Sequence, residues 1–376
     1  MKLSDKIESI EGSKTVAFTA LIQQLRQQGR EIIDLAVGEP QFDTPAPVIE
    51  ATKDALDAQK TRYSPANGLP GLRKQLAAKF SGYDIDNILI TNGSKQALFM
   101  IFQVICDPAD EVIIPVPYWV SFIEQVKLAG GRPVPVTTKN NQLDCEAIEA
   151  AVTPRTKAIL INSPNNPSGT VYPVADLQKI ARLADDHDLF MVADEAYNAF
   201  VYDGSVHASL FDIETARNRV IVTRSFSKSY SMTGFRIGYI AASGQIIAAL
   251  SKIQSHLSGN VCTFAQYGAQ AALSLHDHLL SARHTELQQK RDMAFQIVST
   301  LFDCIKPQGA FYLFPDVSAV LKSNQTSEAL ARRILKQAGV AVVAGEAFGL
   351  AKHLRISYAV SEENLKNGLK RITEVL

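Results

Sequence analysis

The stretch Ser225-Phe-Ser-Lys-Ser-Tyr-Ser-Met-Thr-Gly-Phe-Arg236 places one lysine, Lys228, among hydroxyl side chains directly after an apolar run. The flanking residues 220–224 and 235–240 have the β-branched and aromatic composition typical of strands. Lys228 is therefore expected on an irregular link between two strands, where a rigid scaffold often holds reactive groups. Taken alone, the pattern is more typical of a surface turn with a solvated lysine. Whether Lys228 is a reactive residue must therefore be judged from the rest of the chain.

Nearly continuous apolar runs recur along the first half of the chain. We expect strands at residues 32–38, 87–91, 111–116, 157–162 and 189–194. Helical spacing of apolar residues lies between them, as at 97–105 and 174–186. Strands that are apolar on both faces are covered by helices on both sides. The sequence therefore predicts an α/β fold built on a doubly wound sheet.

The pattern changes after Gly244. Helical spacing dominates residues 245–301, and shorter strands at 310–314, 340–344 and 353–358 then alternate with helices. This is typical of a smaller α+β domain. We expect an N-terminal arm with part of the small domain at 1–40, a large domain at 41–278 and the small C-terminal domain at 279–376.

Composition narrows the class of protein. Lys plus Arg and Asp plus Glu both number 38, so the net charge is zero and no basic footprint for nucleic acid is expected. The four cysteines contain no CxxC pair, which argues against a disulfide framework and a zinc site. No apolar run reaches the roughly 18 residues that a membrane span needs, and the first residues lack an export signal. We expect a cytoplasmic protein without metal.

Several polar side chains stand where an apolar strand ends or inside one. Asp194 closes an apolar strand, so its carboxylate should face a cation or a strong donor. Arg236 follows Lys228 by eight residues and could pair with an anion, and Arg355 lies within an apolar strand. Arg355 should therefore meet a carboxylate of the protein or of a substrate. For Asp194 alone, a helix cap or a surface salt bridge is the commoner interpretation.

Nine segments extend this pattern over nearly the whole chain. They are Gly38-Glu-Pro, Tyr63, Asn92-Gly-Ser-Lys-Gln-Ala-Leu98, Tyr118-Trp119, Asn165-Asn-Pro-Ser-Gly169, Asp194-Glu-Ala-Tyr197, Ser225-Phe-Ser-Lys228, Met232-Thr-Gly-Phe-Arg236 and Leu354-Arg-Ile-Ser357. In this order they resemble the class I aminotransferases of the pyridoxal-phosphate fold-type I superfamily, close to its bacterial aspartate-aminotransferase-like members. The resemblance implies a large domain with a mostly parallel seven-stranded sheet between helices, a smaller α+β domain, and ping-pong transamination between an L-amino acid and a 2-oxo acid.

The resemblance also assigns roles around pyridoxal 5′-phosphate. Lys228 would bind the cofactor covalently and move the proton at the substrate α-carbon, which needs an amine whose pKa can be lowered. Asp194 would pair with the pyridine nitrogen, Tyr197 and Asn166 would hydrogen-bond the phenolic oxygen of the ring, and Trp119 would stack on it.

Two further groups of residues follow from the resemblance. The phosphate would be held by Ser225, Arg236 and the helix-opening turn Gly93-Ser94-Lys95. Tyr63 would reach it from a neighbouring subunit, which implies a homodimer. The substrate α-carboxylate would be bound by Arg355 through a bidentate fork, with Asn166, Trp119 and the Gly38 backbone.

Substrate choice stays open at this point. In the subgroup that the chain resembles, the residues at Lys95 and Thr15 help to bind a distal carboxylate, which would suit aspartate with 2-oxoglutarate. The chain lacks the arginine that better-known aspartate aminotransferases place near Ser255, and Gly259-Asn-Val-Cys262 departs from their pattern. Aromatic amino acids, methionine and prephenate-type substrates therefore remain alternatives.

Two other functions share the same motifs. A pyridoxal-phosphate-dependent carbon–sulfur lyase would keep the lysine, aspartate, tyrosine and arginine positions. The Asn165–Gly169 segment together with Arg355 and the Gly38 loop favours transamination. A ligand sensor fused to a DNA-binding module is disfavoured, because the first strand is expected near residue 32 and the net charge is zero.

Overall fold

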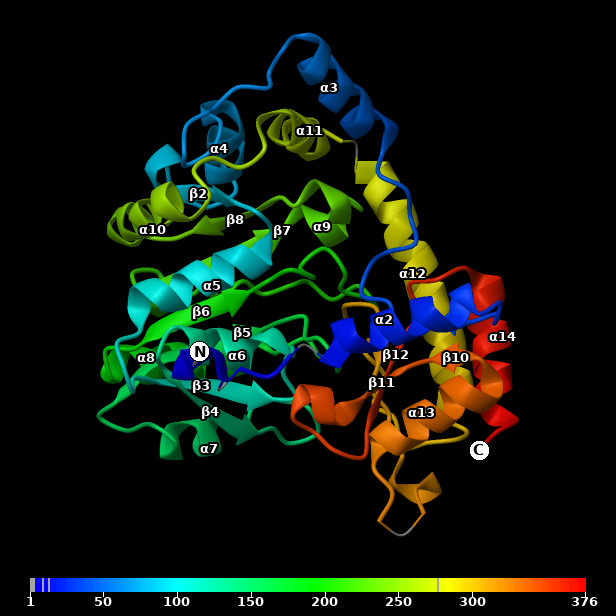
Figure 1. Cartoon of the computed structure of the whole chain (residues 1–376). Coiled ribbons are helices and arrows are strands. Elements are labelled where there is room, and N and C mark those ends of the chain that lie inside the picture. Colours follow the sequence, from blue (N-terminus) through cyan, green and yellow to red (C-terminus); the bar gives the residue numbers. More distant parts are fainter. Residues whose placement is uncertain (1–3, 9, 13, 276, 323) are drawn as a thin grey trace.

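The structure is a computed structural model, and it describes residues 4–8, 10–12, 14–275, 277–322 and 324–376. Within these residues, seven strands form one central sheet (Figure 1). In spatial order they are β2 (Ile88–Thr91), β8 (Gly238–Ala241), β7 (Val220–Ser225), β6 (Phe190–Asp194), β5 (Thr156–Asn162), β3 (Glu111–Val116) and β4 (Arg132–Thr137).

The sheet is mostly parallel. The five strands from β7 to β4 run parallel to one another, whereas β8 runs antiparallel to both β7 and β2. The carboxyl ends of β5, β6 and β7 therefore meet at one edge of the sheet. The predicted α/β class with a mostly parallel seven-stranded sheet is confirmed.

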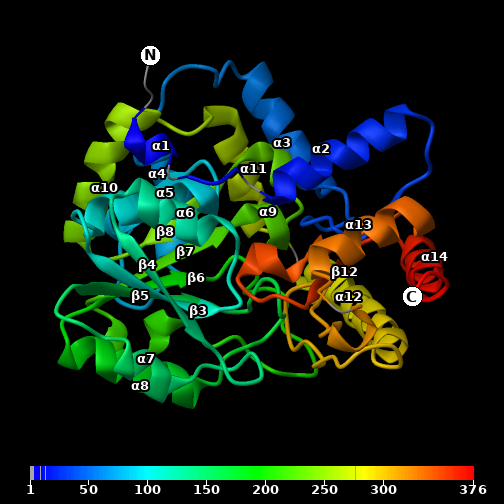
Figure 2. The same ribbon diagram turned by 60° about the horizontal axis from the view of Figure 1, so that its bottom comes forward.

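Both faces of the sheet are buried, because successive side chains of each strand enter different cores. Ile88 and Ile90 pack on one side and Leu89 on the other. One face is covered by α5 (Ser94–Ile105), α6 (Ser121–Leu128) and α10 (Gly244–Leu257). The opposite face is covered by α4 (Pro70–Ala77), α7 (Cys145–Ala150), α8 (Val174–Asp186) and α11 (Thr263–Leu273). Figure 2 shows α5 and α6 on one side of the strands and α7 and α8 on the other.

The link between β7 and β8 is more regular than expected. Lys228 lies on the one-turn helix α9 (Phe226–Ser229), and a 3₁₀ turn follows at Thr233–Phe235. The Ser225 side chain accepts a hydrogen bond from the Ser227 amide at 3.0 Å and so caps α9. The expectation of a strand from residue 235 is wrong, since β8 starts only at Gly238.

A second core lies beside the sheet. It combines α12 (Asp277–Val298), α13 (Ser327–Ala338) and α14 (Glu362–Thr373) with short strands. Strands β11 (Val343–Ala344), β12 (Leu354–Ser357) and β9 (Tyr312–Leu313) form an antiparallel sheet, and β1 (Ile33–Asp34) pairs in parallel with β10 (Val340–Ala341).

Residues near the N-terminus belong to this second core. The expected strand at 32–38 ends at Asp34, where the Asp34 side chain accepts the Ala36 amide at 3.0 Å and turns the chain. Helix α2 (Lys14–Gln27) packs on the same part through Ile22. Phe200 and Tyr202, which follow β6, also enter the second core. The domain limits at residues 40 and 278 stay a prediction.

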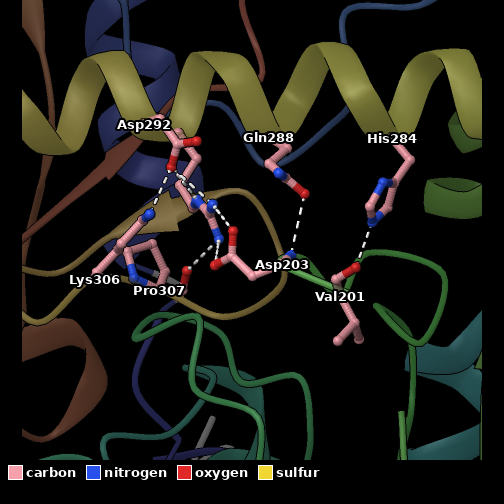
Figure 3. A network of polar contacts seen from close by, with 8 residues as sticks. Val201, Asp203, His284, Gln288, Asp292, Lys306 and Pro307 are labelled. Carbon is pink, nitrogen blue, oxygen red and sulfur yellow. Dashed lines mark hydrogen bonds and ion pairs between the residues drawn. The ribbon is translucent and has the colours of Figure 1, made fainter. Parts of the chain in front are cut away.

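Helix α12 joins the two parts through a polar network (Figure 3). Arg291 is fully buried and binds both carboxylate oxygens of Asp203, at 2.8 and 2.7 Å. It also donates to the Pro307 carbonyl at 3.2 Å, and Gln288 accepts the Asp203 amide at 3.1 Å. The network fixes the segment after β6 against α12 and the turn that leads to β9.

Candidate active site

A cavity of about 600 Å³ opens at the edge where β5, β6 and β7 end. The last residue of each strand lines it: Asn162, Asp194 and Ser225. Tyr312 of the second core and Arg355 on β12 also line it. The cavity therefore lies between the sheet and the smaller part, which is a common place for ligands in α/β proteins.

Asp194 is the buried acid of this cavity. Its Oδ1 accepts the Ala196 amide at 3.2 Å, and within the described residues no cation forms an ion pair with it. Burial raises the pKa of Asp194 to about 7, despite the Ala196 amide. Because the buried Asp194 carboxyl has no cation beside it among the described residues, a cationic group of a ligand would be a favourable partner for it.

Lys228 faces the same space. Its Nζ donates to the Gly38 carbonyl, which brings the Gly38-Glu-Pro segment to the cavity. Burial lowers the pKa of Lys228 to about 8; Glu39 counteracts this shift, whereas Arg355, Arg236 and Lys95 add to it. A neutral amine is therefore accessible near neutral pH, as a general base requires.

Arg355 is buried without a carboxylate partner among the described residues. Its Nη1 donates to Asn166 Oδ1 at 3.0 Å and its Nη2 to the Ala36 carbonyl at 2.7 Å. The guanidinium lies 4.4 Å from the Tyr312 ring centre and 5.1 Å from that of Phe348. Its Nε has no hydrogen-bond partner. A buried guanidinium with an unused donor is suited to an incoming carboxylate.

A chain of hydrogen bonds leads from Arg355 across the cavity floor. Asn166 donates to the Tyr197 hydroxyl at 3.3 Å, and the Tyr197 and Tyr312 hydroxyls lie 2.8 Å apart. Tyr312 was not predicted from the sequence, because an aromatic residue in a short apolar strand reads as a core residue. The partner of its hydroxyl, Tyr197, lies 115 residues away in the chain, so no local pattern indicates the contact.

The start of α5 forms an anion cradle with Arg236. Ser94, Lys95, Ser225 and Arg236 all line the cavity, and Gly93 caps α5 with a φ of 79°. A Cβ on Gly93 would lie 2.6 Å from Arg236 Nη2, so only glycine allows the guanidinium this close. Free helix amides beside a guanidinium favour a phosphate-like anion.

Lys95 and Trp119 lie together. Lys95 Nζ is 4.9 Å from the centre of the Trp119 ring, and both line the cavity. Burial and then Arg236 lower the pKa of Lys95. Trp119 therefore presents one ring to the cavity next to a cation.

Two predicted site residues, Tyr63 and Thr15, do not line the cavity within the part of the chain that the structure describes. Tyr63 is 98% exposed and lines a separate depression of about 620 Å³ with Arg62 and Asn260, so it does not reach the cavity of its own chain. The Thr15 side chain lies outside the described residues, and one turn further along α2 Thr19 lines the cavity.

The described residues form neither a cluster of metal ligands nor a helix that could span a membrane. No group of three or more His, Cys, Asp or Glu side chains there could hold a metal ion. No described helix is both long and apolar enough to span a bilayer.

The fold and the site together define an α/β enzyme that presents a buried acid, a lysine of lowered pKa and an anion cradle to one cavity. Residues 30–372 match the family model of aminotransferase class I and II, and the chain belongs to this family. The predicted family and the enzyme class, an aminotransferase, are confirmed.

Relatives cover the whole chain. It is 40% identical to a probable aspartate/prephenate aminotransferase of Aquifex aeolicus, over 100% of this chain and 98% of that protein. It is 37% identical to an aspartate aminotransferase of Geobacillus stearothermophilus, over 99% of this chain and 98% of that protein. The solved aspartate aminotransferase from Thermus thermophilus with maleate has a TM-score of 0.96 and 39% identity, with both chains covered completely.

Proposed function

We propose that this aminotransferase binds pyridoxal 5′-phosphate in the cavity and transfers the amino group of L-aspartate to 2-oxoglutarate. The observation that carries the proposal is the buried Asp194, which has no cation partner among the described residues and lies in one cavity with Lys228. The names of the relatives support aspartate as the donor.

The residues present fit this cofactor. Its phosphate suits the cradle of Ser94, Lys95, Ser225 and Arg236, with Gly93 leaving room for the guanidinium. Its cationic ring nitrogen suits Asp194, since an opposite charge would keep that carboxyl ionised at neutral pH. Trp119 offers a ring face for stacking.

When bound, pyridoxal phosphate supplies a carbonyl for the substrate amine and a ring that withdraws electrons from the α-carbon. Lys228 would hold the cofactor between turnovers and then take and return the proton at the α-carbon, because its lowered pKa leaves a neutral amine accessible. Tyr197 and Asn166 would hydrogen-bond the ring hydroxyl.

Arg355 would bind the substrate α-carboxylate with Asn166, Trp119 and the Gly38 backbone. The guanidinium is already oriented by Asn166 Oδ1 and the Ala36 carbonyl and is flanked by Tyr312 and Phe348, so little side-chain entropy is lost on binding. The side chains of Lys95 and Thr15 would bind the distal carboxylate, whereas the backbone amide of Lys95 would face the phosphate.

A homodimer would complete the site. The exposure of Tyr63 beside a depression supports an interface there, from which Tyr63 would reach the phosphate of the other subunit. A cytoplasmic location stays a prediction.

A panel of amino donors against 2-oxoglutarate and oxaloacetate tests the proposal. Aspartate with 2-oxoglutarate should give the highest kcat/KM. Prephenate is the second candidate acceptor, favoured by the aspartate/prephenate aminotransferases among the relatives. Release of pyruvate and sulfide from cysteine without an acceptor would instead indicate a lyase, and no turnover with any donor would refute the proposal.

A further inference from the structure

An ion pair lies behind the two strand ends that carry the proposed cofactor groups. Glu195 directly follows Asp194 at the end of β6, and Arg224 directly precedes Ser225 at the end of β7. Neighbouring side chains point to opposite faces of a strand. Asp194 and Ser225 line the cavity, whereas Glu195 and Arg224 meet on the opposite face, against Phe80.

The contacts of this pair are directional. Arg224 Nε and Nη2 lie 2.8 and 2.7 Å from Glu195 Oε2. The other oxygen, Oε1, accepts from the Ser209 hydroxyl at 2.7 Å and the Leu210 amide at 3.3 Å. The Glu195 amide also donates to the Thr223 carbonyl at 2.9 Å, so side chain and backbone join the same two strand ends.

The pair is both buried and ionised. The Glu195 side chain is 3% exposed and that of Arg224 15% exposed. Burial alone would raise the pKa of Glu195, but Arg224, His207 and Ser209 outweigh it and lower this pKa to about 2. In proteins generally, replacing a buried ion pair by apolar side chains of similar volume is often neutral or stabilising, because burying two charges costs desolvation energy. Fixed geometry is what the charges add.

We propose that Glu195 and Arg224 are positioning residues, whose ion pair holds the ends of β6 and β7 at the separation at which Asp194, Ser225 and Lys228 can engage one cofactor. The proposal rests on the proposed function. A positioning role and a purely structural role predict different results when the ion pair is removed. If the pair only stabilised the fold, its loss would lower stability; if it positions the strand ends, the protein should still fold but bind pyridoxal phosphate poorly.

The test uses a double variant, Glu195→Gln with Arg224→Met. It removes both charges of the ion pair together, and glutamine keeps an acceptor for the Ser209 hydroxyl and the Leu210 amide. The control is Arg219→Gln. Arg219 binds Asp185 and Asp188 at 2.8 and 2.9 Å beside the opposite ends of the same two strands.

Three quantities are measured on purified wild type and variants: the Kd of the apoprotein for pyridoxal phosphate, the kcat and KM for aspartate, and the unfolding midpoint of the apoprotein. The double variant should keep the midpoint, bind pyridoxal phosphate about tenfold more weakly and lose about ten- to a hundredfold in kcat. Its KM for aspartate should stay within about twofold, because Arg355 and Asn166 lie on other elements. The control should match wild type in all three.

A double variant with wild-type Kd and kcat would overturn the proposal. So would a parallel loss in the control, or a loss of kcat that appears only together with unfolding of the apoprotein. Wild type that neither binds pyridoxal phosphate nor transaminates would instead refute the proposed function itself. The single variant Arg224→Lys keeps the charge but not the two-donor contact, and it should show the same weaker cofactor binding to a smaller degree.

Discussion

Replacing Asp194 by asparagine should stabilise the cofactor-free protein at alkaline pH and abolish transamination. Burial raises the pKa of this carboxyl from 3.8 to about 7. A shift of this size corresponds to about 4 kcal/mol against the ionised form in the folded chain. Asparagine keeps the shape and an acceptor for the Ala196 amide, but it carries no charge. The variant therefore removes the buried charge alone.

The direction of the pH dependence follows from the raised pKa. The unfolded chain loses the Asp194 proton near pH 4, whereas the folded chain loses it near pH 7. The wild-type apoprotein therefore loses stability relative to the variant as the pH rises from about 4 to about 7. Above about pH 8 the variant should be more stable by up to about 4 kcal/mol, and near pH 5 by much less.

Urea unfolding of the two apoproteins at about pH 5 and about pH 8.5 measures this difference. Asp57→Asn, which removes an exposed carboxylate, is the control and should change the stability little at either pH. Pyridoxal phosphate should reverse the order, because its ring nitrogen would pair with the charge of Asp194 and not with asparagine. A variant that gains no stability at alkaline pH, or that keeps turnover, would refute the reasoning.

Three further predictions concern the proposed ligand contacts. Arg355→Lys should raise KM for every amino acid about ten- to a hundredfold, because one ammonium cannot replace the fork; steady-state kinetics that show a change for aspartate alone would contradict a role at the common α-carboxylate. Lys228→Ala should lose the covalent label that borohydride fixes on the wild-type holoenzyme, and its turnover should fall at least about a hundredfold; a label found by peptide mapping at another lysine would contradict the assignment. Mixing inactive Lys228→Ala subunits with Tyr63→Ala subunits should restore activity in hybrid dimers, and mixtures no more active than their components would exclude a contribution of Tyr63 across subunits.

Much of the fold could be predicted because the strands are buried on both faces. Leu89 faces one core while Ile88 and Ile90 face the other, so each strand reads as a continuous apolar run. Polar residues that interrupt such runs are costly to bury, and for that reason Asp194 and Arg355 could be singled out. The secondary structure of short links between strands could not be predicted from the sequence in the same way. The helix around Lys228 is one turn long, and its cap by Ser225 depends on a local hydrogen bond.

The residues that the sequence did not reveal act through tertiary contacts. Tyr312 meets the Tyr197 hydroxyl over a separation of 115 residues, and Glu195 meets Arg224 over 29. Neither pair has a periodic or local pattern. One signal for the Glu195–Arg224 pair was present in the sequence: each residue is the direct neighbour of a predicted site residue, Asp194 or Ser225. Such neighbours lie on the opposite face of the strand and can hold the ligand-facing residues in place.

The two halves of the cavity divide the proposed work between cofactor and substrate. Asp194, Ser225 and Lys228 stand on the sheet or directly after it, and their relative positions are set by strand pairing. Arg355 stands on β12 of the smaller part and reaches Asn166 of the larger one through a single hydrogen bond. Loosening the contact between the two parts should therefore affect KM for the amino acid more than the affinity for the cofactor. Loosening the ends of β6 and β7 should instead weaken the affinity for the cofactor before it changes KM. Kinetic measurements can therefore distinguish the effect of the Glu195–Arg224 pair from that of Arg355.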